Sequence, residues 1–366
     1  MKKISAFLLA FIFLVSYMHS PTTLYARSTV PSSSIKEISP YTKLNKVSDL
    51  SKILESATYH LQTDVTLLVP SESLDTYSRI IGELNGITSY RLSLSKLYSL
   101  NVLVISLEYK QAYKLTQALK NPSVYKKLTS KDLSLLNVAR SIAAELTKPS
   151  MSDYEKERAV HDYIIQTTTY DYDRLSKGTL PDSSYTAAGV LLNHTAVCEG
   201  YSEATKLLLN LMGIECEIVT GTTTKNIPHA WNIVKLENKW YMLDTTFDDP
   251  ISFDSNGKRY ESLSYDYFNV TSDALMKDHT WDIGKWPVAN STTYNYYVYS
   301  NKVFHTYSSF KSYVIHEIQS GSKEIACYLT HYDSSYDLSF IFNYYQGEVN
   351  YFSPGAAQGS MKIILS

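Results

Sequence analysis

The stretch from Cys198 to Asp244 constrains the fold more than any other part of the chain, because its pattern predicts a helix followed by short strands. Residues 198–212 carry apolar side chains at helical spacing, and Gly213 follows as a residue that ends helices well. Beyond the glycine, apolar residues alternate with glutamates, as in a half-buried strand. The apolar members of that strand are Ile214, Cys216 and Ile218.

Two further strands are expected over residues 230–236 and 239–243. Only Glu237 and Asn238 separate them, and a connection of two such residues suits a tight hairpin. The pattern of residues 198–243 therefore predicts a helix, a half-buried strand and a hairpin, in that order.

Three residues in these elements suit nucleophilic catalysis by a thiol. Cys198 begins the predicted helix, where the positive end of the helix dipole favours thiolate over thiol. His229 begins one strand of the hairpin and Asp244 ends the other, so the carboxylate can hold the imidazole tautomer across the ladder. A lone cysteine before a helix is more often structural, but the histidine and aspartate on adjacent strands favour a catalytic Cys–His–Asp set.

Further site residues are expected around the thiol. The backbone N–H of Cys198 can donate to an oxyanion, and the hydroxyl of Tyr170 is the candidate second donor. Gly200 permits close approach of the backbone beside the thiol. The candidate substrate-pocket residues are Gly200, Tyr201 and Trp231.

Two histidines and two cysteines are alternatives to this set. His194 lies in a predicted turn and is expected to be an exposed loop residue, while His279 is expected to make a structural contact. Cys216 and Cys327 are expected to pack in cores, although a bridge between them is left open. No HExxH, CxxC, glycine-rich phosphate loop or GxSxG elbow occurs, so neither a metal site nor a cofactor is expected.

The N-terminal segment predicts export. Lys2 and Lys3 precede the apolar stretch 4–15 and a polar segment that ends at Ala26, which together match a signal peptide of residues 1–26. The apolar stretch is too short to span a bilayer, so no stable membrane anchor is expected after cleavage. Loss of the two lysines and of no acidic residue takes the net charge from −2 to −4, which does not favour nucleic acid as a partner.

The rest of the chain divides into four predicted segments. Residues 27–49 are rich in Ser, Thr and Pro and indicate a flexible linker. Residues 50–125 alternate helix-like stretches (51–59, 76–84) with strand-like ones (64–70, 101–107) and indicate a small α+β accessory domain. Two helices, 130–146 and 152–166, open a catalytic domain of residues 130–285. A β-rich module is expected over the tyrosine-rich residues 288–366, with a strand over 294–299.

Four motifs within about residues 130–285 resemble the transglutaminase-like superfamily, in its secreted bacterial branch. They are Val197-Cys198-Glu199-Gly200-Tyr201, Gly213-Ile214, His229-Ala230-Trp231-Asn232 and the run from Trp240 to Asp249, with Tyr170-Asp171 upstream and Asp266-Tyr267-Phe268 and His279-Thr280-Trp281 downstream. The resemblance implies a papain-like α+β core in which a cysteine on a helix faces a sheet that carries histidine and aspartate. Cys198, His229 and Asp244 fall on the triad positions of that superfamily.

The resemblance does not choose among reactions, because the superfamily contains cross-linking acyltransferases, peptidases, deamidases and inactive members. The expected function is a secreted or cell-wall-associated cysteine-dependent enzyme that acts on amide bonds through an acyl-enzyme. Its expected partner is a peptide or protein substrate, including a cell-wall peptide, and hydrolysis is favoured because water needs no second pocket. The alternative is a catalytically silent module that binds the cell envelope.

Overall fold

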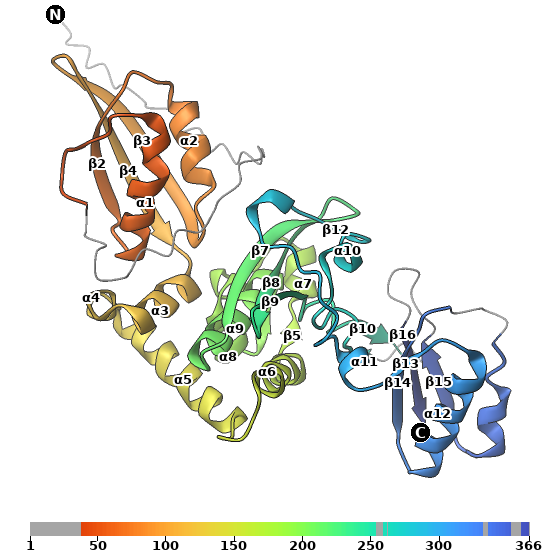
Figure 1. The fold of residues 1–366 in the computed structure, drawn as a ribbon. Helices are drawn as coiled ribbons and strands as arrows, with labels where there is room; N and C mark the ends of the chain where they lie inside the picture. The colour runs from red at the N-terminus through yellow and green to blue at the C-terminus, as the bar shows by residue number, and fades with distance from the viewer. Residues whose placement is uncertain (1–37, 254–258, 262, 332–335, 353–359, 366) are drawn as a thin grey trace, which may run out of the picture.

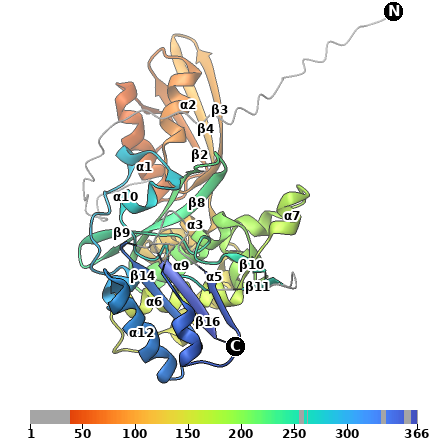
Figure 2. The same cartoon turned by 90° about the vertical axis from the view of Figure 1, so that its right-hand side faces the viewer.

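The computed structural model describes residues 38–253, 259–261, 263–331, 336–352 and 360–365. Three α+β units follow one another along the long axis of the molecule, each with its own four-stranded sheet, and this confirms the predicted fold class (Figure 1). The turned view places the β3–β4 hairpin at one end of the molecule and helix α12 at the other (Figure 2). The predicted signal peptide, residues 1–26, lies outside the described residues.

The N-terminal unit packs two helices on a sheet of order β1-β2-β4-β3. Its elements are β1 (Thr42–Lys43), η2 (Val47–Asp49), α1 (Leu50–Tyr59), β2 (Asp64–Val69), α2 (Leu74–Gly82), β3 (Ile87–Leu97) and β4 (Leu100–Tyr109). The predicted linker is wrong for residues 38–49. There β1 pairs with β2, and Leu44 is only 2% exposed because it packs in the core of this unit.

Three helices lead from this unit into the central one. They are α3 (Gln111–Lys120), α4 (Pro122–Tyr125) and α5 (Ser130–Leu146), followed by α6 (Asp153–Thr167). The predicted start of α5 is confirmed by a capping box, in which Thr129 and Asp132 each accept a backbone N–H of the other. Ser152 and Glu155 form the same arrangement before α6.

Helix α9 (Cys198–Leu211) lies in the middle of the central unit, and five short elements precede it in the chain, of which η3, α8 and β6 pack against it. They are β5 (Thr169–Tyr170), α7 (Tyr172–Ser176), η3 (Asp182–Tyr185), α8 (Ala187–Leu191) and β6 (Thr195–Ala196). The chain leaves α9 through Gly213, whose φ of +84° is the left-handed conformation expected after a helix.

The central sheet has the order β12-β7-β8-β9 and is antiparallel throughout. Its strands are β7 (Glu215–Thr223), β8 (Pro228–Leu236), β9 (Lys239–Leu243) and β12 (His279–Thr280). The predicted hairpin is confirmed, because Glu237 and Asn238 have φ values of 45° and 63°, as a type I′ turn requires. Between β9 and β12 lie β10 (Ile251–Phe253), β11 (Arg259–Glu261) and α10 (Ser272–Leu275), and η4 (Ile283–Lys285) follows.

The C-terminal unit differs from the predicted β module, because helix α12 (Tyr307–Gln319) packs on its sheet. The sheet order is β13-β14-β16-β15. Its other elements are β13 (Val303–Phe304), β14 (Glu324–Leu329), η5 (Ser339–Asn343), β15 (Val349–Phe352) and β16 (Ser360–Leu365).

The strand predicted over 294–299 is also wrong. Residues Tyr296–Tyr299 form the short helix α11, because the Asn295 side chain accepts the N–H groups of Tyr297 and Val298 and starts a helical turn.

Cys216 and Cys327 are both buried and unbridged. Cys216 belongs to the core of the central unit and Cys327 to that of the C-terminal unit, so the expected core packing is confirmed and the open bridge is excluded. Within the described ranges, no helix combines the length and the apolar character needed to cross a bilayer.

Candidate active site

Cys198 is the first residue of α9, so its side chain lies at the positive end of the helix. The preceding residue, Val197, is extended and donates its N–H to the Ser184 carbonyl at 2.9 Å. Gly200 faces the same backbone, and a Cβ there would come within 2.7 Å of the Ser184 oxygen. The expected close approach at Gly200 is therefore present, and it fixes the start of the helix while Cys198 keeps partial exposure.

His229 and Asp244 meet across the β8–β9 pair, as the hairpin predicts. His229 Nε2 lies 2.7 Å from Asp244 Oδ2. The other carboxylate oxygen, Oδ1, accepts the backbone N–H groups of Thr246 at 2.9 Å and Phe247 at 3.1 Å. Both aspartate oxygens are thus held, and Asp244 is fully buried.

The charges of His229 and Asp244 each stabilise the ionised form of the other residue. Burial lowers the pKa of His229, but the charge of Asp244, its hydrogen bond and the contact with the Cys198 side chain outweigh burial and raise that pKa to about 10. Burial raises the pKa of Asp244, but the charge and hydrogen bond of His229, with support from His279, hold it well below its ordinary value. An imidazolium bound to a carboxylate is therefore the favoured state at neutral pH.

His279 is the residue that sequence reasoning placed least accurately. It does make the expected structural contacts, but one of them is to the triad: its Nε2 lies 3.1 Å from the same Oδ2 of Asp244. Its Nδ1 lies 2.6 Å from Asp278 Oδ1, and the Tyr267 hydroxyl donates to Asp278 Oδ2 at 2.5 Å. The resemblance included the His-Thr-Trp segment, but gave no signal that β12 pairs with β7 and so brings this ring to Asp244. His194, by contrast, is exposed in a turn as expected.

His229, Asp244 and His279 also form a group that could hold a metal ion, since their ligand atoms lie within 4.8 Å of one another. The two ring-to-carboxylate distances, 2.7 and 3.1 Å, are those of hydrogen bonds. A tetrahedral zinc ion with ligands at 2.0 to 2.1 Å would need them about 3.3 Å apart. The spacing therefore fits shared protons better than an ion, and the expectation that the protein needs neither metal nor cofactor stays a prediction.

Tyr170 lies where the predicted second oxyanion donor should be. Strand β5 pairs in parallel with β6, and this puts Tyr170 opposite Ala196, two residues before Cys198. Burial raises the pKa of Tyr170, as do the neighbouring Cys198 and Asp244, while a hydrogen bond with the Cys198 backbone opposes the rise. The phenol hydroxyl is therefore protonated and beside the Cys198 N–H; its donation to an oxyanion stays a prediction.

The three predicted pocket residues are wrong as pocket lining. Tyr201 is fully buried, and its hydroxyl donates to Asp249 Oδ2 at 2.6 Å. Trp231 is 1% exposed and stacks beside His229, with ring centroids 5.9 Å apart. Gly200 is buried against η3. These residues face into the core because they lie on the inner sides of α9 and β8, so they pack behind Cys198 and His229.

A second buried network, which the sequence did not reveal, lies behind the loop that follows Asp244. His161 of α6 contacts Asp248 Oδ2 through Nε2 at 3.1 Å, and Asp248 donates its own N–H to the Asp244 carbonyl at 3.1 Å. On the next turn of α6, Glu157 accepts a hydrogen bond from Asn269 at 2.8 Å. In the sequence His161 and Glu157 look like ordinary polar positions of a helix, so only the fold shows that His161 contacts the loop after Asp244.

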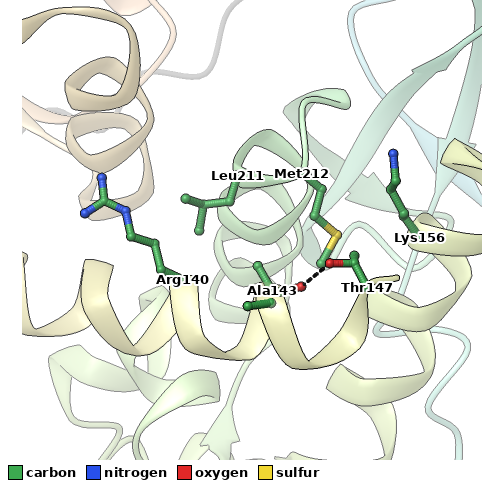
Figure 3. A pocket seen from close by; sticks show the side chains of 7 residues that line it. Arg140, Ala143, Thr147, Lys156, Leu211 and Met212 are labelled. Atoms are coloured by element: carbon green, nitrogen blue, oxygen red, sulfur yellow. Dashed lines mark hydrogen bonds between the residues drawn. The ribbon is translucent and has the colours of Figure 1, made fainter. Parts of the chain in front are cut away.

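The cavity of Figure 3, about 300 Å³ in volume, is not this site. It lies between α5, α6 and the end of α9, and Leu211 and Met212 belong to its lining. These residues are 13 and 14 positions after Cys198, or roughly 20 Å along a helix. Thr147, another lining residue, donates its hydroxyl to the Ala143 carbonyl at 2.7 Å (Figure 3).

One comparison with known proteins, the match to a family profile, covers the three candidate catalytic residues. Residues 140–245, which include Cys198, His229 and Asp244, match the sequence profile of the Transglutaminase-like superfamily. Kyphoscoliosis peptidase of Mus musculus is 23% identical over 157 residues, which are 40% of this chain and 23% of the relative. The Homo sapiens protein of that name gives the same identity and coverage. The match thus spans about a quarter of the length of these relatives.

Among solved structures, one described as a crystal structure of a TGase is similar, with a TM-score of 0.30 and 18% sequence identity. The similarity covers 50% of this chain and 51% of that one.

Proposed function

We propose that this chain, whose residues 140–245 match the Transglutaminase-like superfamily, is a thiol-dependent enzyme that acts on amide bonds of peptides or proteins through an acyl-enzyme. One observation carries the proposal. The cysteine at the start of α9 contacts a histidine that is bound, at 2.7 Å, to a fully buried aspartate. This is the arrangement that activates a thiol for attack on a carbonyl.

In the first half of the reaction, the Cys198 sulfur attacks the carbonyl carbon of the amide while His229 holds the former thiol proton. The tetrahedral oxyanion is stabilised by the Cys198 N–H, with the Tyr170 hydroxyl as second donor. His229 then gives its proton to the leaving nitrogen, the C–N bond breaks, and a thioester to Cys198 is left. Asp244 stays ionised throughout and keeps the His229 ring in position.

In the second half, water or an amine attacks the thioester carbonyl and passes a proton to His229. Collapse of this second intermediate breaks the C–S bond and restores the starting state. Water gives a free acid and an amine gives a new amide, so the acceptor alone decides between hydrolysis and transfer. We favour hydrolysis, because water needs no second binding site.

Exposed apolar side chains on α7 and η3 support the proposal of a peptide or protein substrate. Tyr172 and Leu175 of α7 are 57% and 43% exposed, and Tyr185 of η3 is 41% exposed. These elements adjoin the strand of Tyr170 and the Ser184 carbonyl that holds Val197. Exposed aromatic side chains provide contact area for a peptide.

A glutamine-containing peptide library, incubated with and without a primary amine and analysed by mass spectrometry, tests the proposal. Cleaved or deamidated peptides, or amine adducts, should form with the native protein and with Cys327→Ala, a matched thiol control from the C-terminal core. Cys198→Ala should form none.

If Cys198 gives no covalent adduct with any carbonyl electrophile while the protein is folded, the proposal is wrong. If binding to cell-wall material is the sole measurable property and survives Cys198→Ala, the alternative of a silent binding module is correct.

We also propose that the enzyme acts outside the cytoplasm, on peptides of the cell wall or its surroundings. The support is the signal-like pattern of residues 1–26. N-terminal sequencing of the exported protein should begin after Ala26, and an uncleaved cytoplasmic product would refute export.

A further inference from the structure

The ring of His279 lies between two carboxylates. Its Nδ1 is 2.6 Å from Asp278 Oδ1, and its Nε2 is 3.1 Å from Asp244 Oδ2. Both distances are hydrogen-bond distances, and His279 is 1% exposed, so no solvent molecule competes for these contacts.

The number of protons on the His279 ring follows from these two contacts. A neutral imidazole has one N–H and one lone pair, so it can donate to only one of two carboxylates and would turn its lone pair toward the other. An imidazolium donates to both. Burial lowers the pKa of His279, but the hydrogen bonds to Asp244 and Asp278 outweigh burial and raise it.

The surroundings of the ring contain one opposing charge. Asp278 precedes His279 on its own segment, Asp244 ends β9, and Tyr267 donates to Asp278 from the loop before α10. His229 of β8 is the opposing group, with its ring centroid 5.3 Å from that of His279. The rings of Trp231 and Phe247 also contact the His279 ring, with centroids 5.0 and 4.6 Å away.

We propose that His279 is a positioning residue that acts as a second imidazolium behind the triad, holds the Asp244 carboxylate and divides its charge between two histidines. Both rings bond to the same oxygen of Asp244, so each cation lowers the proton affinity of the other. His279 thereby keeps His229 acidic enough to return its proton to the leaving nitrogen. This step rests on the proposed role of His229 as acid and base.

Nuclear magnetic resonance of histidine-labelled protein tests the proposal without any substrate. The titrations use the Cys198→Ala background, because removing the side chain that helps to raise the pKa of His229 lowers its midpoint toward an accessible pH. At pH 7 both nitrogens of His279 should carry protons. His279→Asn, which can still donate one hydrogen bond to Asp244, should raise the His229 midpoint by about one pH unit or more.

Asp278→Asn gives an independent variant that leaves the ring in place. It should convert His279 to the neutral form and raise the titration midpoint of His229, as His279→Asn does. His305→Asn, which changes an exposed histidine of the C-terminal unit, should shift nothing. In the protein with Cys198 intact, His279→Asn should lower kcat more than it changes KM. It should also move the basic limb of the plot of kcat against pH to higher pH.

A neutral His279 at pH 7, or a His229 midpoint that neither variant moves, would overturn the proposal and leave a purely structural contact. The failure of the proposed amide chemistry would be seen separately, as the absence of a Cys198 adduct, and would leave the titrations of His229 and His279 unaffected.

Discussion

Replacement of Asp244 by asparagine should be far more damaging than the loss of one charge suggests. The reason is that the two carboxylate oxygens are used differently: Oδ1 accepts two backbone N–H groups, and Oδ2 faces both histidines. An asparagine must place its single oxygen toward the backbone donors, so its NH₂ group points at His229. His229 Nε2 then accepts a hydrogen bond, and the proton moves to Nδ1, which faces Cys198. That tautomer cannot take the thiol proton.

The size of the effect follows from the alternative orientation. Turning the amide so that its oxygen meets His229 leaves the N–H groups of Thr246 and Phe247 without acceptors. Each unsatisfied buried donor costs about 1 to 3 kcal/mol, so the productive tautomer is disfavoured by about 2 to 6 kcal/mol. At about 1.4 kcal/mol per tenfold, Asp244→Asn should lower kcat/KM by about 30-fold to 10⁴-fold.

Two assays separate this mechanism from general damage. The rate of Cys198 alkylation by iodoacetamide reports the thiolate without a substrate and should fall together with kcat/KM. Histidine spectra should show His229 protonated at Nδ1 and not at Nε2. Asp273→Asn, at an exposed position of α10, is the matched control and should leave both rates unchanged. Activity of Asp244→Asn within threefold of the native protein would refute the tautomer argument.

Two predictions concern residues that pack around the candidate site, Glu157 of α6 and Gly221 of β7. Burial raises the pKa of Glu157 from 4.5 to about 8, so the stability that its protonated form confers is complete below pH 4.5 and is lost as the pH rises to about 8. The free energy of unfolding of Glu157→Gln, measured in urea, should therefore equal that of the native protein near pH 4.5 and exceed it by about 2 to 5 kcal/mol at pH 8. Glu145→Gln, which changes an exposed glutamate, should show no such dependence on pH. A difference for Glu157→Gln that is the same at both pH values would contradict the prediction. A Cβ at Gly221 would lie 2.1 Å from the Thr280 carbonyl oxygen, so Gly221→Ala should force β12 away from β7, lower the unfolding free energy by about 1 to 3 kcal/mol and reduce activity. Gly284→Ala is the control, because a Cβ there would meet its nearest atom at 3.5 Å, and it should change neither stability nor activity. An unchanged melting curve for Gly221→Ala would show that β12 and β7 accommodate the methyl group without loss of stability.

The sequence predicted the triad because its two strand-borne members are local to one hairpin. With only Glu237 and Asn238 between the strands, the register follows from the turn, and His229 and Asp244 are brought to the same end. His279 could not be predicted in the same way. It reaches Asp244 because the two-residue strand β12 pairs with Thr222 and Thr223 of β7, more than fifty residues earlier in the chain. A strand of two residues leaves no periodic pattern to read.

The tyrosine-rich run 294–299, most of which forms α11, shows the opposite case, because a local strand signal was present but was outweighed. Alternating tyrosines favour a strand, yet Asn295 caps a helix by accepting two backbone N–H groups. Tyr297 then turns inward and donates its hydroxyl to Asp266 at 2.7 Å, a contact that a strand would not place there. The cap and this hydrogen bond therefore favour the helical turn over the strand that residue propensity predicts.

The amphipathic pattern of α9 predicts one buried face, but most of the helix is buried on all sides. This burial fixes the position of Cys198. From Gly200 to Leu209 every residue is buried, polar ones included. Glu203 accepts the N–H groups of Ala112 and Ala187, each at 3.2 Å, and so joins α9 to α3 and α8. Lys206 donates to the Cys216 carbonyl at 3.0 Å and joins α9 to β7. Any displacement of α9 would break hydrogen bonds to three elements in a buried setting, so Cys198 is held in place against His229 before any substrate binds.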